Sequence, residues 1–147
     1  MDKVSDQLWL TDISHAMTDD VAHFDLVLTV CEDDISELID CNHEHIALPS
    51  TTGCSSKTSA PTSFEEFAEA ADTLYRALAD GETVLTHCRS GTSRSVAVAG
   101  AAFARHREIG FDEALQLVEE VRPSANPSEV YRSFAKDYIT KCQPQAP

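Results

Sequence analysis

The chain has 147 residues, 42% hydrophobic and 24% charged, a composition typical of one soluble globular domain covering residues 1–147. Its 25 acidic and 11 basic residues give a formal net charge of −14, so we expect no direct binding to nucleic-acid phosphates. No apolar run is long enough to cross a bilayer, and the first residues lack the pattern of a secretory signal, so neither membrane association nor secretion is expected.

The excess of acidic residues has two interpretations, and both stay open at this point. The protein is either an ordinary acidic cytoplasmic protein kept soluble by self-repulsion, or one from a salt-accumulating organism. In the second case the charges are screened over about 3 Å at 1 M salt and cost little stability.

Five cysteines occur at irregular spacing, at positions 31, 41, 54, 88 and 142. The odd number and the absence of a C-x-x-C pair indicate neither a disulfide framework nor a zinc site. We also expect no other metal and no cofactor. A reducing cytoplasm is the simplest location.

The first half of the chain predicts short strands. Residues 7–10 and 24–30 form strands, and the second is apolar enough to lie inside a sheet. Residues 45–48 give a weaker strand, and residues 50–63, rich in Ser, Thr, Gly and Pro, form an exposed loop.

The second half predicts four helices and one strand. A capping-box pattern at Ser63 and Glu66 opens the first helix, which Gly81 ends. The elements that follow are a strand at 82–87, a helix at 94–107 that is apolar on all sides, a helix at 111–121, and a helix from Pro127 to about Ile139 with a flexible tail from about 141. This order indicates an α/β fold with a mostly parallel central sheet flanked by helices and a helical C-terminal third.

The segment between the strand at 82–87 and the helix at 94–107 has the composition of an anion site. Small residues let the backbone N–H groups of the loop converge, the helix N-terminus adds partial positive charge, and Arg94 adds a two-pronged donor. These features favour the thiolate form of Cys88, a nucleophile for a bound phosphoryl group. The hydroxyl of Ser95 is expected to hydrogen-bond that sulfur, and His87 is expected to orient the loop rather than act as a base.

The stretch HCRSGTSRS resembles the H-C-x5-R-S/T signature of the cysteine-based protein tyrosine phosphatases. Its setting, VLTHCRSGTSRSVAVAGA, and the later VRPSANPSEVYRSF are similar to the dual-specificity branch. The resemblance implies a phosphatase fold and phosphorylated protein substrates, with Cys88 as nucleophile and Arg94 as phosphate ligand. It also implies a phosphate-binding backbone formed by Arg89, Ser90, Gly91, Thr92, Ser93 and Arg94.

The chain departs from the family pattern at the general acid. The family carries an aspartate on the loop before the long helix, but residues 46–63 contain no Asp or Glu. Asp33 or Asp34, just beyond a strand, is one substitute, although together with Glu32 they also fit a solvated acidic turn. Alternatively the enzyme has no general acid and forfeits up to about 10²–10⁴-fold in rate, retaining activity best on aryl phosphates.

Other residues leave further alternatives. Ser128 stands where the family often has an asparagine that braces the loop. Cys31, Cys41 and Cys142 are expected to be core or surface thiols, whereas Cys54 is a weak candidate for a redox partner of Cys88. Two other functions remain: a module that binds phosphorylated partners with little turnover, and a rhodanese-like sulfurtransferase, because CRSG resembles the start of such loops.

Overall fold

A computed structural model describes residues 1–18, 21–39, 42–48 and 64–142. The strands are β1 (Asp2–Lys3), β2 (Leu8–Thr11), β3 (Leu26–Thr29), β4 (His43–His45) and β5 (Val84–His87). The helices are α1 (Ile13–Thr18), α2 (Phe64–Ala79), α3 (Arg94–Arg107), α4 (Phe111–Val121) and α5 (Glu129–Cys142), with a 3₁₀ turn η1 (Ser36–Leu38).

The strands form one five-stranded sheet in the order β1-β2-β5-β3-β4. The last four strands in this order are parallel, and only the edge strand β1 is antiparallel to its neighbour. At the carboxyl end of the sheet, Thr11 and Thr29 lie level with His87 on either side of it. The mostly parallel central sheet is therefore confirmed, with β5 at its centre.

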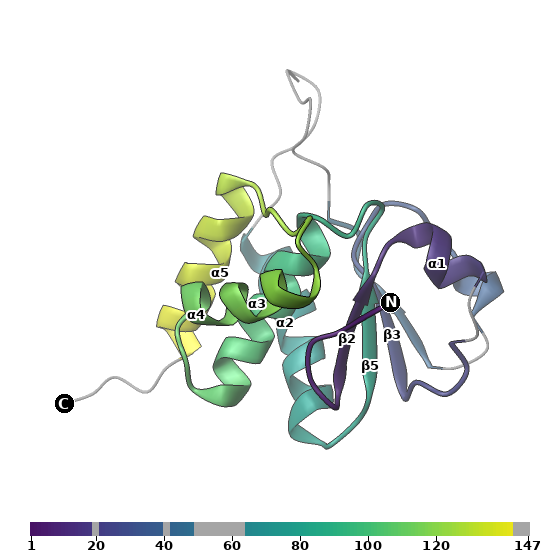
Figure 1. Cartoon of the computed structure of the whole chain (residues 1–147), viewed down its shortest axis with the longest axis horizontal. Coiled ribbons are helices and arrows are strands. Elements are labelled where there is room, and N and C mark those ends of the chain that lie inside the picture. The colour runs from purple at the N-terminus through teal and green to yellow at the C-terminus, as the bar shows by residue number, and fades with distance from the viewer. Residues whose placement is uncertain (19–20, 40–41, 49–63, 143–147) are drawn as a thin grey trace.

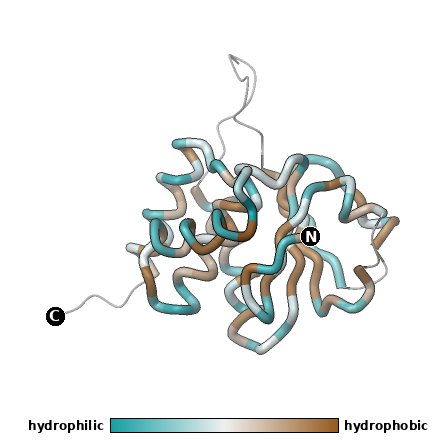
Figure 2. The backbone as a smooth tube through the Cα atoms, in the orientation of Figure 1, coloured by the Kyte–Doolittle hydropathy of each residue, from teal (hydrophilic) through white to brown (hydrophobic). Residues whose placement is uncertain are grey.

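Helices cover both faces of this sheet (Figure 1). The larger layer is formed by α2, α3, α4 and α5, and the smaller by α1 and η1. Because side chains alternate across a strand, Leu26 and Leu28 of β3 pack into the larger layer while Val27 packs into the smaller one. Figure 2 shows the hydrophobic residues of the strands between these two layers.

Helix α3 is the central element of the larger layer, and it starts directly after the loop at 88–93. All its residues from Arg94 to Ala104 are buried. At Gly100 the ring of Phe111 comes so close that an added Cβ would lie 2.8 Å from a ring carbon. Close packing of α4 against α3 therefore fixes the position of α3, and α3 in turn fixes the end of the loop that precedes it.

Element boundaries differ from the sequence-based expectation in several places. Helix α1 is an addition, capped by Asp12, whose carboxylate accepts the backbone N–H of His15 at 2.9 Å; its six residues are too few for a periodic signal. Strand β4 starts two residues before the strand expected at 45–48, because His43–His45 pair with Val27–Thr29. The apolar residues after it make only single backbone hydrogen bonds to the end of β3 and the residue that follows it. Helix α5 starts at Glu129 and extends to Cys142, past the expected end.

Some expectations fall on residues outside the described ranges. These include the cap at Ser63, the whole loop expected at 50–63, and residues 143–147 of the tail. Among the described residues, no helix combines the length and the hydrophobicity that a membrane crossing requires.

Candidate active site

The loop at residues 88–93 lies beyond the carboxyl end of the central strand β5 and before the N-terminus of α3. Strand β5 is buried along its whole length, so the start of the loop is fixed by strands on both sides. Gly91 turns the chain with a φ of +72°, a left-handed conformation that glycine adopts without a steric penalty.

Every backbone carbonyl of this loop is held by a donor outside its centre. All six carbonyl oxygens of residues 88–93 accept a hydrogen bond of 2.7–3.2 Å. In chain order the donors are Nδ1 of His87, the amide of Ile13, the guanidinium of Arg122 for both residue 90 and residue 91, the amide of Asn126 and the amide of Ala97. In a trans peptide the N–H points away from the C=O. The amides of Ser90 to Ser93 therefore point away from these donors, and they have no backbone or side-chain acceptor among the described residues. They form a nest for an anion.

Cys88 and Ser95 form the buried floor of the nest. Their Sγ and Oγ atoms lie 3.1 Å apart, and both residues are fully enclosed, with 1% and 0% exposure. Ser95 is in the first turn of α3, so the helix that supplies partial positive charge also positions a hydroxyl against the sulfur. The arrangement places a potential nucleophile beneath converging N–H donors.

Arg94 is buried beside the loop, with 7% exposure. Its Nη1 donates to the carbonyl oxygen of Leu48 at 2.9 Å and to the carboxylate of Glu32 at 3.3 Å. Glu32 is itself largely exposed, so this ion pair is only partly shielded from water. A buried cation thus stands next to the anion nest with one of its nitrogens already fixed.

His87 packs behind the loop and is held neutral. Nδ1 donates to the carbonyl of Cys88 at 3.2 Å, because a carbonyl can only accept, so Nε2 accepts from the Thr29 hydroxyl at 2.8 Å. Thr29 in turn accepts from Nε2 of His43 at 2.7 Å. Burial lowers the pKa of His87 to about 4. These contacts fit the expected orienting role.

Asp33 and Asp34 both follow β3, but each is engaged in other contacts. Asp33 forms a two-point ion pair with Arg89, and this hydrogen bonding lowers its pKa. Asp34 accepts from the amide and hydroxyl of Ser36, which lowers its pKa too. A general acid needs the opposite shift. The assignment of either residue as the acid stays a prediction that these contacts do not favour.

Ser128 stands where the family often has an asparagine that braces the loop, and here its side chain and its backbone bind different partners. Its hydroxyl accepts the Tyr131 amide at 3.4 Å, within the first turn of α5, whereas its backbone N–H donates to the Ser93 hydroxyl at 3.0 Å. A serine side chain is too short to cap the helix and reach the loop as well. The segment braces the loop through main-chain groups instead, including the bond from the Asn126 amide to the Thr92 carbonyl.

The remaining polar groups lie around the rim. The hydroxyls of Ser90 and Thr92 are 2.7 Å apart, and Arg89 is exposed next to Asp33. Among the described cysteines, Cys31 is buried and its pKa is raised by burial, and Cys142 is half-buried at the end of α5. Cys41 and Cys54 lie outside the described residues. No cluster of His, Cys, Asp or Glu able to hold a metal occurs in the part of the chain that is described.

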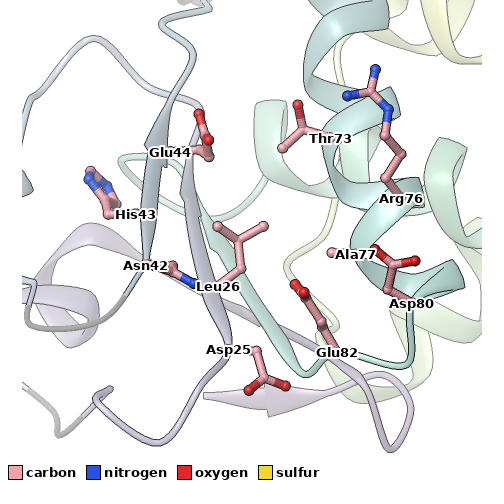
Figure 3. A pocket seen from close by; sticks show the side chains of 10 residues that line it. All are labelled: Asp25, Leu26, Asn42, His43, Glu44, Thr73, Arg76, Ala77, Asp80 and Glu82. Carbon is pink, nitrogen blue, oxygen red and sulfur yellow. The ribbon is translucent and has the colours of Figure 1, made fainter.

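A separate cavity lies at the opposite end of the sheet. It has a volume of about 280 Å³ and is lined by residues from the start of β3, from β4, from α2 and from the segment before β5 (Figure 3). Four carboxylates line it, those of Asp25, Glu44, Asp80 and Glu82, against the single guanidinium of Arg76. No residue of the 88–93 loop is among its walls, and its acidic lining does not suit an oxyanion.

Comparison with known proteins identifies the family. The model of the family described as "Dual specificity phosphatase, catalytic domain" matches residues 8–138, which include the whole loop. The chain belongs to this family. The resemblance of HCRSGTSRS to the cysteine-based phosphatases is thereby confirmed.

Individual dual specificity phosphatases match the chain over shorter stretches. Dual specificity phosphatase 28 of Mus musculus is 39% identical over 70 residues, and the Homo sapiens protein is 36% identical over 66. Dual specificity protein phosphatase 16 of Homo sapiens is 34% identical over 74 residues. These alignments cover 45–50% of the chain and 43%, 38% and 11% of the three relatives, so the chain matches less than half the length of each.

Solved structures share the fold over nearly the whole chain. The crystal structure of human DUSP28 superposes with a TM-score of 0.78 and 20% identity, covering 96% of each chain. The structure titled "Crystal structure of Tk-PTP in the active form" gives 0.75 and 23%, covering 95% of this chain and 96% of that one. These likenesses confirm the dual specificity phosphatase fold.

Within this family framework, two residues of the site were not anticipated from sequence. Glu32 was assigned to a solvated turn, yet its carboxylate pairs with Arg94. Arg122 was seen only as part of the VRPSANPSEVYRSF stretch, yet it donates to two carbonyls of the loop. An arginine directly before a proline, far along the chain, carries no local signal of such a contact.

Proposed function

We propose that this protein hydrolyses phosphotyrosine monoesters in phosphorylated proteins through a phosphocysteine intermediate on Cys88. The observation that carries the proposal is the ring of outward-held carbonyls around a buried cysteine, which leaves the loop amides to bind the phosphoryl oxygens. Membership of the dual specificity phosphatase family supports it. The cavity at the opposite end of the sheet is unsuitable for the same group, because carboxylates outnumber cations in its lining.

In the first step the Cys88 thiolate attacks phosphorus and the bond from phosphorus to the ester oxygen breaks. The negative charge of the equatorial oxygens is stabilised by the loop amides of Ser90 to Ser93 and by the N-terminus of α3. Arg94 adds a fixed cation, since Leu48 and Glu32 hold one of its nitrogens and leave its other donors for the anion.

We propose that the leaving oxygen departs without a general acid from the described residues. The lowered pKa values of Asp33 and Asp34 support this, because both carboxylates are ionised at neutral pH. An unprotonated phenolate, whose conjugate acid has a pKa near 10, leaves more readily than an alkoxide. Phosphotyrosine is therefore the preferred substrate over phosphoserine and phosphothreonine.

In the second step water attacks the phosphocysteine, the sulfur–phosphorus bond breaks, and inorganic phosphate is released. The Ser95 hydroxyl, 3.1 Å from Sγ, donates to the departing thiolate. Because a thiolate nucleophile must stay reduced, we assign the protein to the cytoplasm.

A second candidate function is the binding of phosphorylated partners with little turnover. The same observation supports it: neither Asp33 nor Asp34 is suited to act as a general acid. The rhodanese-like alternative receives no support from the family match, which is to a phosphatase model. One set of assays separates these functions: hydrolysis of phosphotyrosine, phosphoserine and phosphothreonine peptides, peptide binding, and sulfur transfer from thiosulfate to cyanide.

The deciding variants are Cys88→Ser and the matched control Cys142→Ser, which changes a half-buried cysteine at the end of α5. We expect phosphotyrosine peptide hydrolysis to disappear in the first and to persist in the second, with chelators having no effect. Phosphotyrosine turnover that survives Cys88→Ser would refute the mechanism. Tight peptide binding by the wild type without any phosphate release would favour the binding module.

A further inference from the structure

Arg122, directly after α4, contacts the 88–93 loop on its carbonyl side. Its Nε donates to the Gly91 carbonyl at 2.7 Å and its Nη2 to the Ser90 carbonyl at 3.0 Å. The remaining end of the guanidinium, Nη1, donates to the carboxylate of Asp2 in β1 at 2.6 Å. One planar group therefore joins two adjacent loop carbonyls to the edge strand of the sheet.

This geometry fixes the direction of two peptide planes. A guanidinium presents its donors in a rigid fork, so the Ser90 and Gly91 carbonyls are both held toward Arg122. The N–H groups of the same planes, which belong to Gly91 and Thr92, then point to the opposite side. A cation on the carbonyl side of a peptide also polarises its N–H and strengthens that N–H as a donor to an anion.

The residue facing Arg122 is matched to it. Gly91 has a φ of +72°, and a Cβ added there would overlap Nη2 of Arg122 and lie 2.8 Å from the carbonyl oxygen of Thr11. The guanidinium thus occupies the space that glycine leaves free. The Arg122 side chain is only 12% exposed, so water does not easily replace its contacts.

We propose that Arg122, held by Asp2, is a positioning residue that aims the Gly91 and Thr92 amides at the bound phosphoryl group. It acts through the loop and does not touch the reacting atoms. This inference rests on the proposed function only in taking a phosphate-like oxyanion as the bound group.

The test compares Arg122→Gln, Arg122→Lys and Asp2→Asn with the wild type. The matched control is Arg76→Gln, which removes an exposed arginine of α2 that pairs only loosely with Asp72 at 3.9 Å. For each protein three quantities are measured: tungstate affinity by calorimetry per mole of folded protein, kcat and KM with p-nitrophenyl phosphate, and the thermal midpoint.

We expect Arg122→Gln to weaken tungstate binding about tenfold or more, because two loop amides lose their fixed direction. Arg122→Lys should recover only part of the affinity, since a lysine cannot join both carbonyls. Asp2→Asn should act in the same direction with a smaller effect. Arg76→Gln should bind tungstate like the wild type.

A different pattern would overturn the proposal: a lower thermal midpoint in Arg122→Gln with tungstate affinity within twofold of the wild type. That result would give Arg122 a merely structural role. If Arg122→Gln does not fold, wild-type tungstate affinity in both Arg122→Lys and Asp2→Asn overturns it equally. The proposed function fails separately, when the wild type binds tungstate but hydrolyses no phosphate ester.

Discussion

Asp33 and Arg89 form a two-point ion pair at the mouth of the 88–93 loop. The Nη2 atom of Arg89 lies 2.8 Å from one carboxylate oxygen and its Nε lies 3.1 Å from the other. The hydrogen bonds from Arg89 lower the pKa of Asp33. Asp33, the candidate acid that contacts the loop, is therefore ionised at the pH where the enzyme is expected to work and has no proton to donate.

The first prediction concerns the general acid. We expect Asp33→Asn and Asp34→Asn to leave kcat for a poor leaving group, such as phenyl phosphate, within about threefold of the wild type, far below the loss expected on removing an acid. Hydrolysis of aryl phosphates with graded leaving-group pKa should show a steep dependence in all three proteins. The pH profile of kcat should lack a basic limb, because no group has to stay protonated.

A large effect of Asp33→Asn on a poor leaving group would contradict this prediction. If Asp33→Asn slows phenyl phosphate hydrolysis about 10²-fold but leaves p-nitrophenyl phosphate unaffected, Asp33 is the acid. Its contact with Arg89 would then have to open when substrate binds.

Ser95→Ala is expected to slow the second chemical step. Its hydroxyl is the hydrogen-bond partner of the Cys88 sulfur, and removing a single preorganised donor of this kind costs about 10²-fold. With p-nitrophenyl phosphate, rapid-mixing kinetics should show a burst of nitrophenolate followed by a slow steady state. A single slow phase without a burst would mean that Ser95 assists the attack on phosphorus instead.

His87 predicts a defined dependence of stability on pH. Its pKa is about 4 in the folded protein, against about 6.5 in an unfolded chain, so the unfolded state binds the extra proton between these values. The free energy of unfolding should therefore fall as the pH drops below 6.5, by about 2 kcal/mol at pH 5 from this residue alone. His43, which also has a lowered pKa, adds in the same direction.

Urea unfolding at pH 7.5 and pH 5 measures this effect in the wild type and in His87→Asn. The variant retains His43 and should lose only the part due to His87. An NMR titration of the wild type should show His87 neutral down to about pH 5. Protonation of its ring near pH 6.5 would contradict the buried, neutral assignment.

Gly91→Ala should impair the site more than an ordinary loop substitution does. Alanine would have to adopt the left-handed φ of +72°, which strains its backbone, and its methyl group would overlap the guanidinium of Arg122. We expect a loss of tungstate affinity of at least about tenfold, since the nest has to reopen. Gly81→Ala is a matched control: it also has a positive φ of +78°, but no atom lies within 4 Å of its added Cβ. An equal loss of tungstate affinity in Gly81→Ala would mean that the loss reflects general destabilisation of the fold rather than the overlap at the nest.

The net charge of −14 predicts that salt stabilises the fold. The thermal midpoint should rise between 0.1 M and 2 M KCl. In the double variant Glu119→Gln/Glu120→Gln, which removes two exposed charges of α4, we expect a higher midpoint at 0.1 M and a smaller response to salt. A midpoint that falls with KCl in the wild type would exclude adaptation to a salt-rich cytoplasm.

The elements of the fold that the sequence predicts best are those with a strong pattern. The sequence predicts helix α3 at its observed bounds. It also predicts a central, buried helix, because the residues are apolar on every side, and the burial of Arg94 to Ala104 confirms this. Strand β4 was less predictable, because its start depends on pairing with Val27–Thr29 rather than on its own apolar residues. Short helix α1 has a cap at Asp12 but no periodic face.

In the candidate site, the residues that are close in sequence were predictable and their distant supports were not. The spacing from Cys88 to Ser95 indicates a nest by itself, since strand, loop and helix follow one another. The contacts of Glu32 with Arg94 and of Arg122 with Gly91 join segments that meet only in the folded chain. Around Ser128 the loop is held by backbone donors, and backbone hydrogen bonds leave no mark in residue type.

The loop carbonyls owe their orientation to contacts from both ends of the chain, which makes the site a late product of folding. The guanidinium that holds the loop is 31 residues away along the chain, and its own anchor at Asp2 is 120 residues from it. A nascent or partly unfolded chain with only the β5–α3 segment formed lacks these long-range contacts, whose closure is slow to form. Such a chain has the reactive cysteine without the oxyanion nest. Phosphate or tungstate should therefore bind only the fully folded state and raise its stability with concentration, so that ligand-induced stabilisation doubles as a measure of correct assembly.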